Sequence, residues 1–342
     1  MSSVSENPST MTVEPYRPPR RDLREWDALS ASADEFRFRF SDAASREFCA
    51  FARGIDARVD LENIAPHAEV LQEFAADVER CREHLDSGAG IAIIDPISGL
   101  SPRQKQILSW TVSRMLGTPL VQSSEGNRLV HVFDRDRTKR MEDGARYHQT
   151  RQGGSIHTDN VNAPDPWEYL VFACVEPALV GGESIVVNGY GVHRYLSDHV
   201  PDALRILEQP FVWEYRGISD DVYRAPIVTY GGNGDPYFRY LRPYLESAHR
   251  KVDQPLTDDQ MWALDVLDSV LDVSDLQLRI RMKAGEILIT FDSQMFHGRT
   301  TFADHANATD MNASTNRSTP LRRTFERTWV RSNNLACAEE TS

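Results

Sequence analysis

Hydrophobic residues recur along this chain with two different spacings, and each spacing predicts its own kind of element. A spacing of three to four residues predicts helices over 66–85, 101–117 and 258–272. The second stretch opens with Ser101 and Pro102, residue types favoured at a helix start, and it closes with a glycine. Short apolar runs bounded by turn-forming residues predict strands over 90–97, 129–133, 168–175, 184–188, 210–215, 226–230, 236–241, 276–282, 285–291 and 324–331.

These elements indicate an α+β fold. Many short strands, with helices early in the chain and one late, favour a mainly antiparallel sheet or barrel. Strands and helices do not alternate regularly, and no GxGxxG segment follows a strand, which argues against a doubly wound sheet. The late helix is expected to carry four apolar residues on one side, Met261, Leu264, Leu267 and Leu271.

Two polar stretches suggest how the chain is organised. Residues 1–20 are rich in Ser and Pro and predict a disordered N-terminal tail. Residues 304–319 are rich in Asn, Thr, Ser and Ala without apolar periodicity, which is typical of a loop or lid between ordered segments. We therefore expect one domain over 21–335 with a lid or loop at 304–319.

Composition and charge narrow the partners. The 342 residues are 40% hydrophobic, enough for a sizeable core. The 38 basic and 51 acidic residues give a net charge of −13, which disfavours binding to nucleic acid. No apolar run approaches the roughly 18 residues of a membrane span, and the N-terminal segment lacks the apolar region of a secretory signal. The four cysteines form no CxxC pair and are too few and scattered for a disulfide scaffold, so we expect a cytoplasmic location. The oligomeric state stays open.

One short segment points to a metal. GGSIHTDN places His157 and Asp159 two positions apart, so on an extended strand end both side chains point to the same face. The best candidate for a third ligand is His297, which follows the strong strand of 285–291. Two histidines and one carboxylate leave open coordination positions, an arrangement that suits a non-haem Fe(II) oxygenase. The same donors also bind Zn²⁺, so a zinc hydrolase is the alternative.

Two further motifs follow in the chain. PALVGGESIVVN is a Gly-Gly turn that leads into a strand, and PLRRTFERTWVR lies near the C-terminus. In a strand, the second motif would place Arg323, Phe325, Arg327, Trp329 and Arg331 on one face. A row of arginines on one strand face of an acidic protein indicates an anion site.

With these motifs in this order, the sequence resembles the TauD/TfdA superfamily of Fe(II)/2-oxoglutarate-dependent oxygenases over roughly residues 90–331. The HGR that begins at His297 is also similar to the clavaminate synthase-like branch, which includes asparagine and arginine hydroxylases of antibiotic pathways. The resemblance implies a double-stranded β-helix (jelly roll) core with flanking helices. It also implies Fe(II) as cofactor, 2-oxoglutarate as cosubstrate and O₂ as oxidant.

The resemblance assigns roles residue by residue. His157, Asp159 and His297 match the catalytic metal ligands, and Ser184 matches a hydroxyl residue that contacts 2-oxoglutarate. Arg323 matches the residue that binds the distal carboxylate of 2-oxoglutarate, with Arg322 as the second choice. The arginine four residues later, Arg327, matches one that binds an anionic group of the substrate, and Asn160 is a further candidate for substrate contact.

The expected activity is hydroxylation of an unactivated C–H bond in a small anionic metabolite, an amino acid or amino-acid-like acid of secondary metabolism. Desaturation and epoxidation are variants, whereas the carboxylate of Asp159 disfavours halogenation. Alternatives are a carrier-bound acyl, sulfonate or phosphonate substrate, and a non-catalytic jelly-roll binding protein. Asp220, Asp221, Arg239 and Arg242 lie in segments that contact substrate in related enzymes, but we expect these four on the solvated surface.

Overall fold

The computed structural model describes residues 24–123, 125–135, 150–161, 163–164, 167–215, 220–308 and 321–333. None of its helices is both long enough and apolar enough to cross a membrane in the part of the chain described. The helices, apart from short 3₁₀ turns, are α1 (Asp42–Gly54), α2 (Gln72–Ser87), α3 (Pro102–Leu116), α4 (Gly189–His199), α5 (Pro201–Leu207), α6 (Arg242–Lys251) and α7 (Asp258–Leu271).

Two sheets form the centre of the fold. The larger sheet has the order β1 (Arg37–Phe38), β2 (Ile91–Ile94), β14 (Ile287–Phe291), β6 (Tyr169–Glu176), β17 (Thr324–Ser332) and β3 (Gly117–Pro119), and β4 (Leu129–Val132) also pairs with β17. The smaller sheet has the order β13 (Gln277–Ile280), β8 (Ser184–Asn188), β15 (Met295–Arg299) and β5 (Gly154–His157). Three two-stranded ribbons complete the described strands: β9 (Phe211–Glu214) with β10 (Val222–Ala225), β11 (Val228–Tyr230) with β12 (Pro236–Phe238), and β7 (Val180–Gly181) with β16 (Phe302–Ala303).

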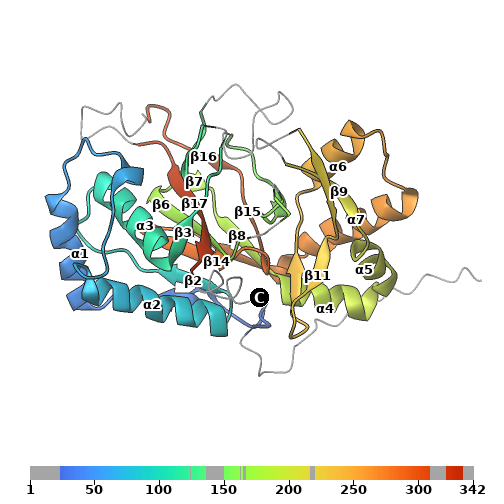
Figure 1. The fold of residues 1–342 in the computed structure, drawn as a ribbon, viewed down its shortest axis with the longest axis horizontal. Coiled ribbons are helices and arrows are strands. Elements are labelled where there is room, and N and C mark those ends of the chain that lie inside the picture. Colours follow the sequence, from blue (N-terminus) through green and yellow to red (C-terminus); the bar gives the residue numbers. More distant parts are fainter. Residues whose placement is uncertain are drawn as a thin grey trace, which may run out of the picture.

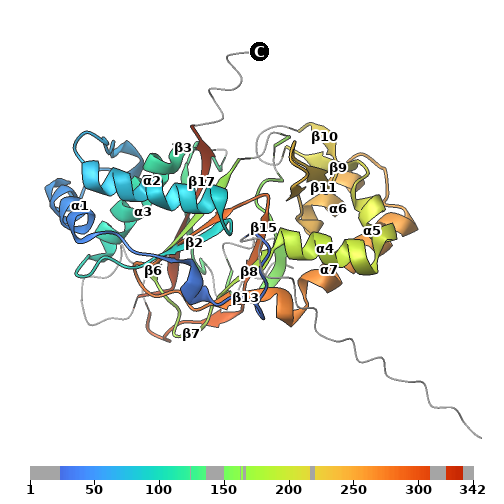
Figure 2. The same cartoon turned by 90° about the horizontal axis from the view of Figure 1, so that it is seen from below.

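The side chains of the strands sort into three apolar layers. Along β2, Ala92 and Ile94 join the core under α1–α3, whereas Ile91 and Ile93 fill the space between the two sheets. The smaller sheet turns its other face toward α4–α7, so the sheets lie between two groups of helices (Figures 1 and 2). Both faces of these strands are therefore covered, which is why they show continuous apolar runs rather than alternation. The predicted α+β jelly roll with flanking helices is confirmed.

The sequence prediction missed part of the helical content. Besides the predicted helices, the chain forms α1, α4, α5 and α6, so the expectation of helices early and one late was wrong. The run 236–241 looks strand-like throughout, but β12 ends at Phe238 and α6 follows from Arg242, with a proline in its first turn. In α7, Leu264, Leu267 and Leu271 are buried as expected, whereas Met261 is exposed.

The predicted tail, domain bounds and lid are not tested by the described residues. The tail at 1–20 and residues 309–319 of the expected lid lie outside the described residues. The single domain over 21–335 stays a prediction.

A buried acid lies between β17 and α3. Glu326 is fully buried, and its Oε1 accepts a hydrogen bond of 2.7 Å from Gln106 Nε2. His131 Nδ1 lies 3.6 Å from the same oxygen. Burial raises the pKa of Glu326 to about 7, because the carboxylate loses its hydration, and the hydrogen bond from Gln106 and the charge of Arg103 offset this only in part.

This shift predicts how stability depends on pH. The folded protein holds a proton on Glu326 up to about pH 7, while the unfolded chain releases it near the ordinary glutamate pKa of 4.5. Unfolding therefore becomes easier as pH rises through this window and changes no further above it. In Glu326→Gln the amide keeps an oxygen for Gln106 and cannot ionise. Its free energy of unfolding relative to wild type should rise between pH 4.5 and 8 by at most about 3 kcal/mol.

Chemical denaturation at several pH values measures this difference, with Glu69→Gln on the exposed surface as the matched control. A constant difference between Glu326→Gln and wild type across the window would contradict the interpretation.

Candidate metal centre

Strand register brings the two histidines together. In the pairing of β5 with β15, His157 lies directly opposite His297, so both imidazoles point to the same face of the smaller sheet. Asp159 follows just beyond the end of β5, and all three side chains are buried. One donor atom from each residue lies within 4.8 Å of the others. The three predicted ligands thus meet, although His297 is 140 residues away from His157 in the sequence.

Each histidine turns its Nε2 atom toward Asp159. Nδ1 of His157 lies 2.8 Å from the carbonyl oxygen of Ser155. Because a carbonyl can only accept, Nδ1 is the donor in this contact, and Nε2 is the nitrogen that faces Asp159 Oδ1. Burial, together with the neighbouring charge of His157, lowers the pKa of His297 to about 3, so its imidazole is neutral at physiological pH.

The spacing of the donors fits a metal ion. Asp159 Oδ1 lies 3.6 Å from His157 Nε2 and 3.8 Å from His297 Nε2. Three donors at right angles with bonds of about 2.1 Å would lie about 3.0 Å apart. A small inward movement of buried side chains closes this difference. The donor set of two imidazoles and one carboxylate on one side is the set that non-haem Fe(II) oxygenases use.

The other oxygen of Asp159 is held by two donors. Trp329 Nε1 donates to Oδ2 at 2.8 Å, and Arg327 Nη1 lies 2.8 Å from the same atom. Burial alone would raise the pKa of Asp159, but Arg327 and the two histidines lower it well below its ordinary value. The carboxylate is therefore charged, with Oδ1 turned toward the imidazoles.

Asp292 supports this arrangement from beneath, and the sequence analysis did not identify it. Its Oδ1 accepts a hydrogen bond of 3.1 Å from the backbone N–H of Asp159 and lies 3.9 Å from Nδ1 of His297. Burial, followed by the charge of Asp159, raises the pKa of Asp292 well above its ordinary value. An acidic residue directly after a mainly apolar strand was the signal available in the sequence.

Asn160 is bound within the protein. Its Oδ1 accepts from the Thr158 hydroxyl at 2.7 Å, and its Nδ2 donates to the carbonyl of Phe238 at 3.1 Å. These bonds tie the turn that carries Asp159 to the end of β12. That Asn160 contacts substrate stays a prediction.

The predicted anion site gathers residues from both sheets. Ser184 lies opposite Arg299 in the pairing of β8 with β15, on the face that carries His297. Arg299 and Arg323 both lie over the ring of Phe302, at 5.0 and 4.9 Å from its centroid. Arg299 is buried and was not predicted; its place two residues after His297 in a strand was the signal for it.

Close packing fixes Arg323 further. A Cβ at Gly182 would come within 3.0 Å of Arg323 Nε, and this glycine has a φ of +70°. The Gly-Gly turn of the sequence motif therefore serves both the backbone bend and the approach of the arginine. Arg322, the second choice, instead donates to the carbonyl of Asp134 at 3.5 Å.

The four residues expected on the surface divide into two groups. Asp220 and Asp221 are exposed. Arg239 is buried, where it donates to the Tyr223 hydroxyl at 2.7 Å and to a backbone carbonyl, so the surface prediction was wrong for it. Arg242 is half-buried in ion pairs with the exposed Asp265 and the half-buried Asp268, so the surface prediction holds for it in part.

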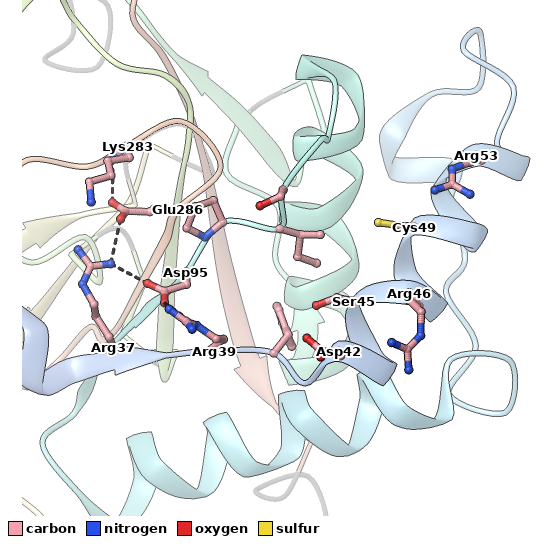
Figure 3. A pocket seen from close by; sticks show the side chains of 14 residues that line it. Arg37, Arg39, Asp42, Ser45, Arg46, Cys49, Arg53, Asp95, Lys283 and Glu286 are labelled. Carbon is pink, nitrogen blue, oxygen red and sulfur yellow. Dashed lines mark hydrogen bonds and ion pairs between the residues drawn. The ribbon is translucent and has the colours of Figure 1, made fainter.

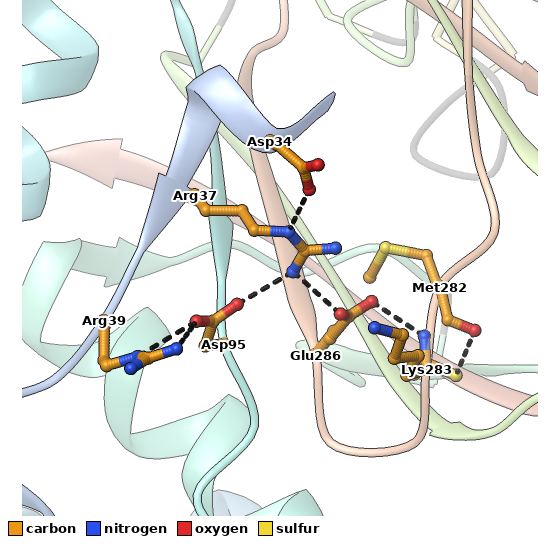
Figure 4. Close-up of polar contacts among 8 residues, drawn as sticks. Asp34, Arg37, Arg39, Asp95, Met282, Lys283 and Glu286 are labelled. Carbon is orange, nitrogen blue, oxygen red and sulfur yellow. Dashed lines mark hydrogen bonds and ion pairs between the residues drawn. The ribbon is translucent and has the colours of Figure 1, made fainter. Parts of the chain in front are cut away.

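A separate cavity of about 1010 Å³ lies between α1 and the edge of the larger sheet (Figure 3). Arg37 in its wall donates to Asp95 at 2.8 Å and to Glu286 at 2.9 Å (Figure 4). These contacts join β1 to the neighbouring strand ends, and burying Glu286 depends on this cation. The lining contains none of the predicted metal ligands, so we do not place the active site here.

Comparisons with known proteins agree with this chemistry. Residues 58–315 match the model of the family described as "Taurine catabolism dioxygenase TauD, TfdA family". FR-33289 synthase of Streptomyces rubellomurinus is 26% identical over 234 residues, which cover 66% of this chain and 67% of that protein. Trimethyllysine dioxygenase of Gallus gallus is 22% identical over 156 residues, 44% of this chain and 37% of its own length.

Solved structures show the same fold. An asparagine oxygenase in complex with Fe(II), hydroxyasparagine and succinate has a TM-score of 0.60 at 17% identity, covering 86% of this chain and 93% of its own. The non-haem iron oxygenase OrfP in complex with Fe and α-ketoglutaric acid has a TM-score of 0.58 at 17% identity, covering 90% of this chain and 97% of its own.

Removal of the Asp292 carboxylate tests the support of the metal ligands. In Asp292→Ala the backbone N–H of Asp159 loses its acceptor, so the turn that carries the ligand carboxylate loses one of its supports. We expect the dissociation constant for Co²⁺, used as a stable substitute for Fe²⁺, to rise roughly 10- to 100-fold. Calorimetric titration measures it. Asp292→Asn keeps an oxygen acceptor, so its dissociation constant should lie between those of wild type and Asp292→Ala. A wild-type dissociation constant in Asp292→Ala would contradict the supporting role of Asp292.

Proposed function

We infer the activity from the premise that the chain belongs to the TauD/TfdA family and is an Fe(II)/2-oxoglutarate-dependent dioxygenase. This assignment replaces the zinc-hydrolase and binding-protein alternatives. We propose that His157, Asp159 and His297 hold the iron. The observation that carries this proposal is that two imidazoles and one charged carboxylate are buried together, with one donor atom of each within 4.8 Å of the others.

When bound, iron with 2-oxoglutarate and O₂ supplies the oxidising power that hydroxylates a C–H bond, with succinate and CO₂ as coproducts. The protein positions the reactants. In this proposal Arg323 binds the distal carboxylate of 2-oxoglutarate, assisted by the hydroxyl of Ser184. Support comes from their position: the β8–β15 register places Ser184 on the metal-bearing face, and the guanidinium of Arg323 lies against Phe302 within the predicted anion site.

For the substrate, we propose a free amino acid or amino-acid-like acid of secondary metabolism. Support comes from the similar structures, an asparagine oxygenase bound to 3-hydroxyasparagine and OrfP bound to 3-hydroxyarginine, and from a relative named as a synthase. Arg327 is the proposed partner of the substrate's anionic group. Its Nη1 lies beside Asp159 and its Nε donates to Gln122, so the cation is held at the edge of the metal site.

An anaerobic spectrum tests the proposed ligands. Wild-type protein with Fe²⁺ and 2-oxoglutarate should develop the weak visible charge-transfer band of the bidentate chelate. His157→Ala should lose both the metal and the band, because one of three ligands is gone. Arg323→Gln should still bind metal but need roughly a hundredfold more 2-oxoglutarate, because a buried charge pair loses one partner.

Arg331→Gln, further along β17, is the matched control and should behave as wild type. A folded, iron-loaded wild type that shows no band would overturn the 2-oxoglutarate site.

A succinate-release screen tests the substrate class. Amino acids, including asparagine and arginine, should stimulate succinate formation above the uncoupled rate, and Arg327→Gln should raise the KM of the active one. The panel includes taurine and carrier-bound acyl groups. Stimulation by one of these, with none by any free amino acid, would replace the amino-acid proposal with that alternative.

A further inference from the structure

We propose that Trp329 is a positioning residue that holds the Asp159 carboxylate by its outer oxygen, so that only Oδ1 binds the metal. The inference rests on the proposed function, since it takes Asp159 as a metal ligand. Trp329 is not itself a metal ligand. Its proposed effect is on the number of coordination positions that remain for 2-oxoglutarate and O₂.

The two oxygens of Asp159 have different surroundings. Oδ1 is the atom that lies 3.6 and 3.8 Å from the Nε2 atoms of the two histidines. Oδ2 points away to the larger sheet, where the indole N–H of Trp329 donates to it at 2.8 Å. A hydrogen bond from a neutral donor of fixed direction thus sets the rotation of the carboxylate.

Arg327 also contacts Oδ2 but is a less permanent partner. Its guanidinium sits on a long side chain, is shared with Gln122, and is the proposed partner of the anionic substrate. If it turns toward that anion, Oδ2 keeps the indole N–H as a donor. The permanent restraint on this oxygen is therefore the tryptophan.

Trp329 is itself held rigidly. The side chain is 5% exposed, and its ring stacks on Trp167 with centroids 4.1 Å apart and an interplanar angle of 20°. Its backbone lies in β17, which is paired with β6 on one side and with β3 and β4 on the other. An indole fixed in this way can position a neighbouring group without moving.

The restraint matters because a carboxylate can bind a metal through one or both oxygens. Three single-atom ligands would leave three positions in an octahedral site, two for the chelating cosubstrate and one for O₂. A second bond from Oδ2 would fill one of them. The expected result of losing the indole N–H is therefore a protein that still binds metal but binds 2-oxoglutarate poorly.

Trp329→Phe tests the inference, because it keeps a stacking ring and removes the donor. Trp167→Phe, which alters the other ring of the stack, is the matched control. Co²⁺ affinity should stay within a few-fold of wild type in both variants. In Trp329→Phe the anaerobic half-saturation for 2-oxoglutarate should rise roughly tenfold and the chelate band should shift, whereas Trp167→Phe should keep both. A crystal structure of the Co²⁺-loaded Trp329→Phe protein should show both Asp159 oxygens on the metal.

A second variant guards against a folding defect. Replacement of Trp329 by 3-benzothienylalanine keeps the shape and stacking of the indole but has sulfur in place of N–H. Wild-type 2-oxoglutarate affinity and an unshifted band in this variant would refute the inference while leaving the metal assignment intact. If instead His157→Ala retains wild-type metal affinity, the ligand set is wrong, so the two failures are distinguishable.

Discussion

The buried charge of Asp159 is the constraint on which the rest of the site depends. A carboxylate out of water is strongly unfavourable unless cations or hydrogen-bond donors surround it. Here the donors come from β17, the histidines from β5 and β15, and the backbone N–H of Asp159 itself is fixed by Asp292. Each contact requires a particular sheet to be in place, so the site forms only when both sheets have closed on each other.

The two faces of β17 show how the surroundings of a carboxyl group decide whether it is charged. On one face, Arg327 and Trp329 reach Asp159 and keep its carboxylate charged. On the other face, Glu326 meets α3 with an amide as its closest partner, and its pKa rises to about 7. One strand therefore carries the hydrogen-bond donors that keep the Asp159 carboxylate charged and, on its opposite face, a buried acid that is neutral below about pH 7. The alternation of side chains along a strand separates these two requirements by a single residue.

The flanking helices cover the outer faces of the two sheets. Helices α1–α3 cover the larger sheet and α4–α7 lie against the smaller one (Figure 1). The two histidines and Asp159 lie on the opposite face of the smaller sheet, where Trp329 of the larger sheet reaches Asp159. The apolar residues between the sheets, such as Val186 and Phe325, set the separation between β8, which begins at Ser184, and β17, which follows Arg323. Because interiors pack to near-crystalline density, this separation is fixed by side-chain volume.

The sequence by itself determined the local features. Apolar runs located most strands, the Ser-Pro start and glycine end located α3, and the two-residue spacing of His157 and Asp159 indicated ligands on one face. Alternation along 324–331 also gave the correct two faces of β17, because strand period depends only on neighbouring residues. Tertiary structure decided the rest. The hydrogen bonds of Asp159 with Asp292 and Trp329 span 133 and 170 residues, and the pairing of Ser184 with Arg299 depends on strand register. Local spacing carries no information on which distant strand pairs with which, so these contacts became visible only when the two sheets were assembled.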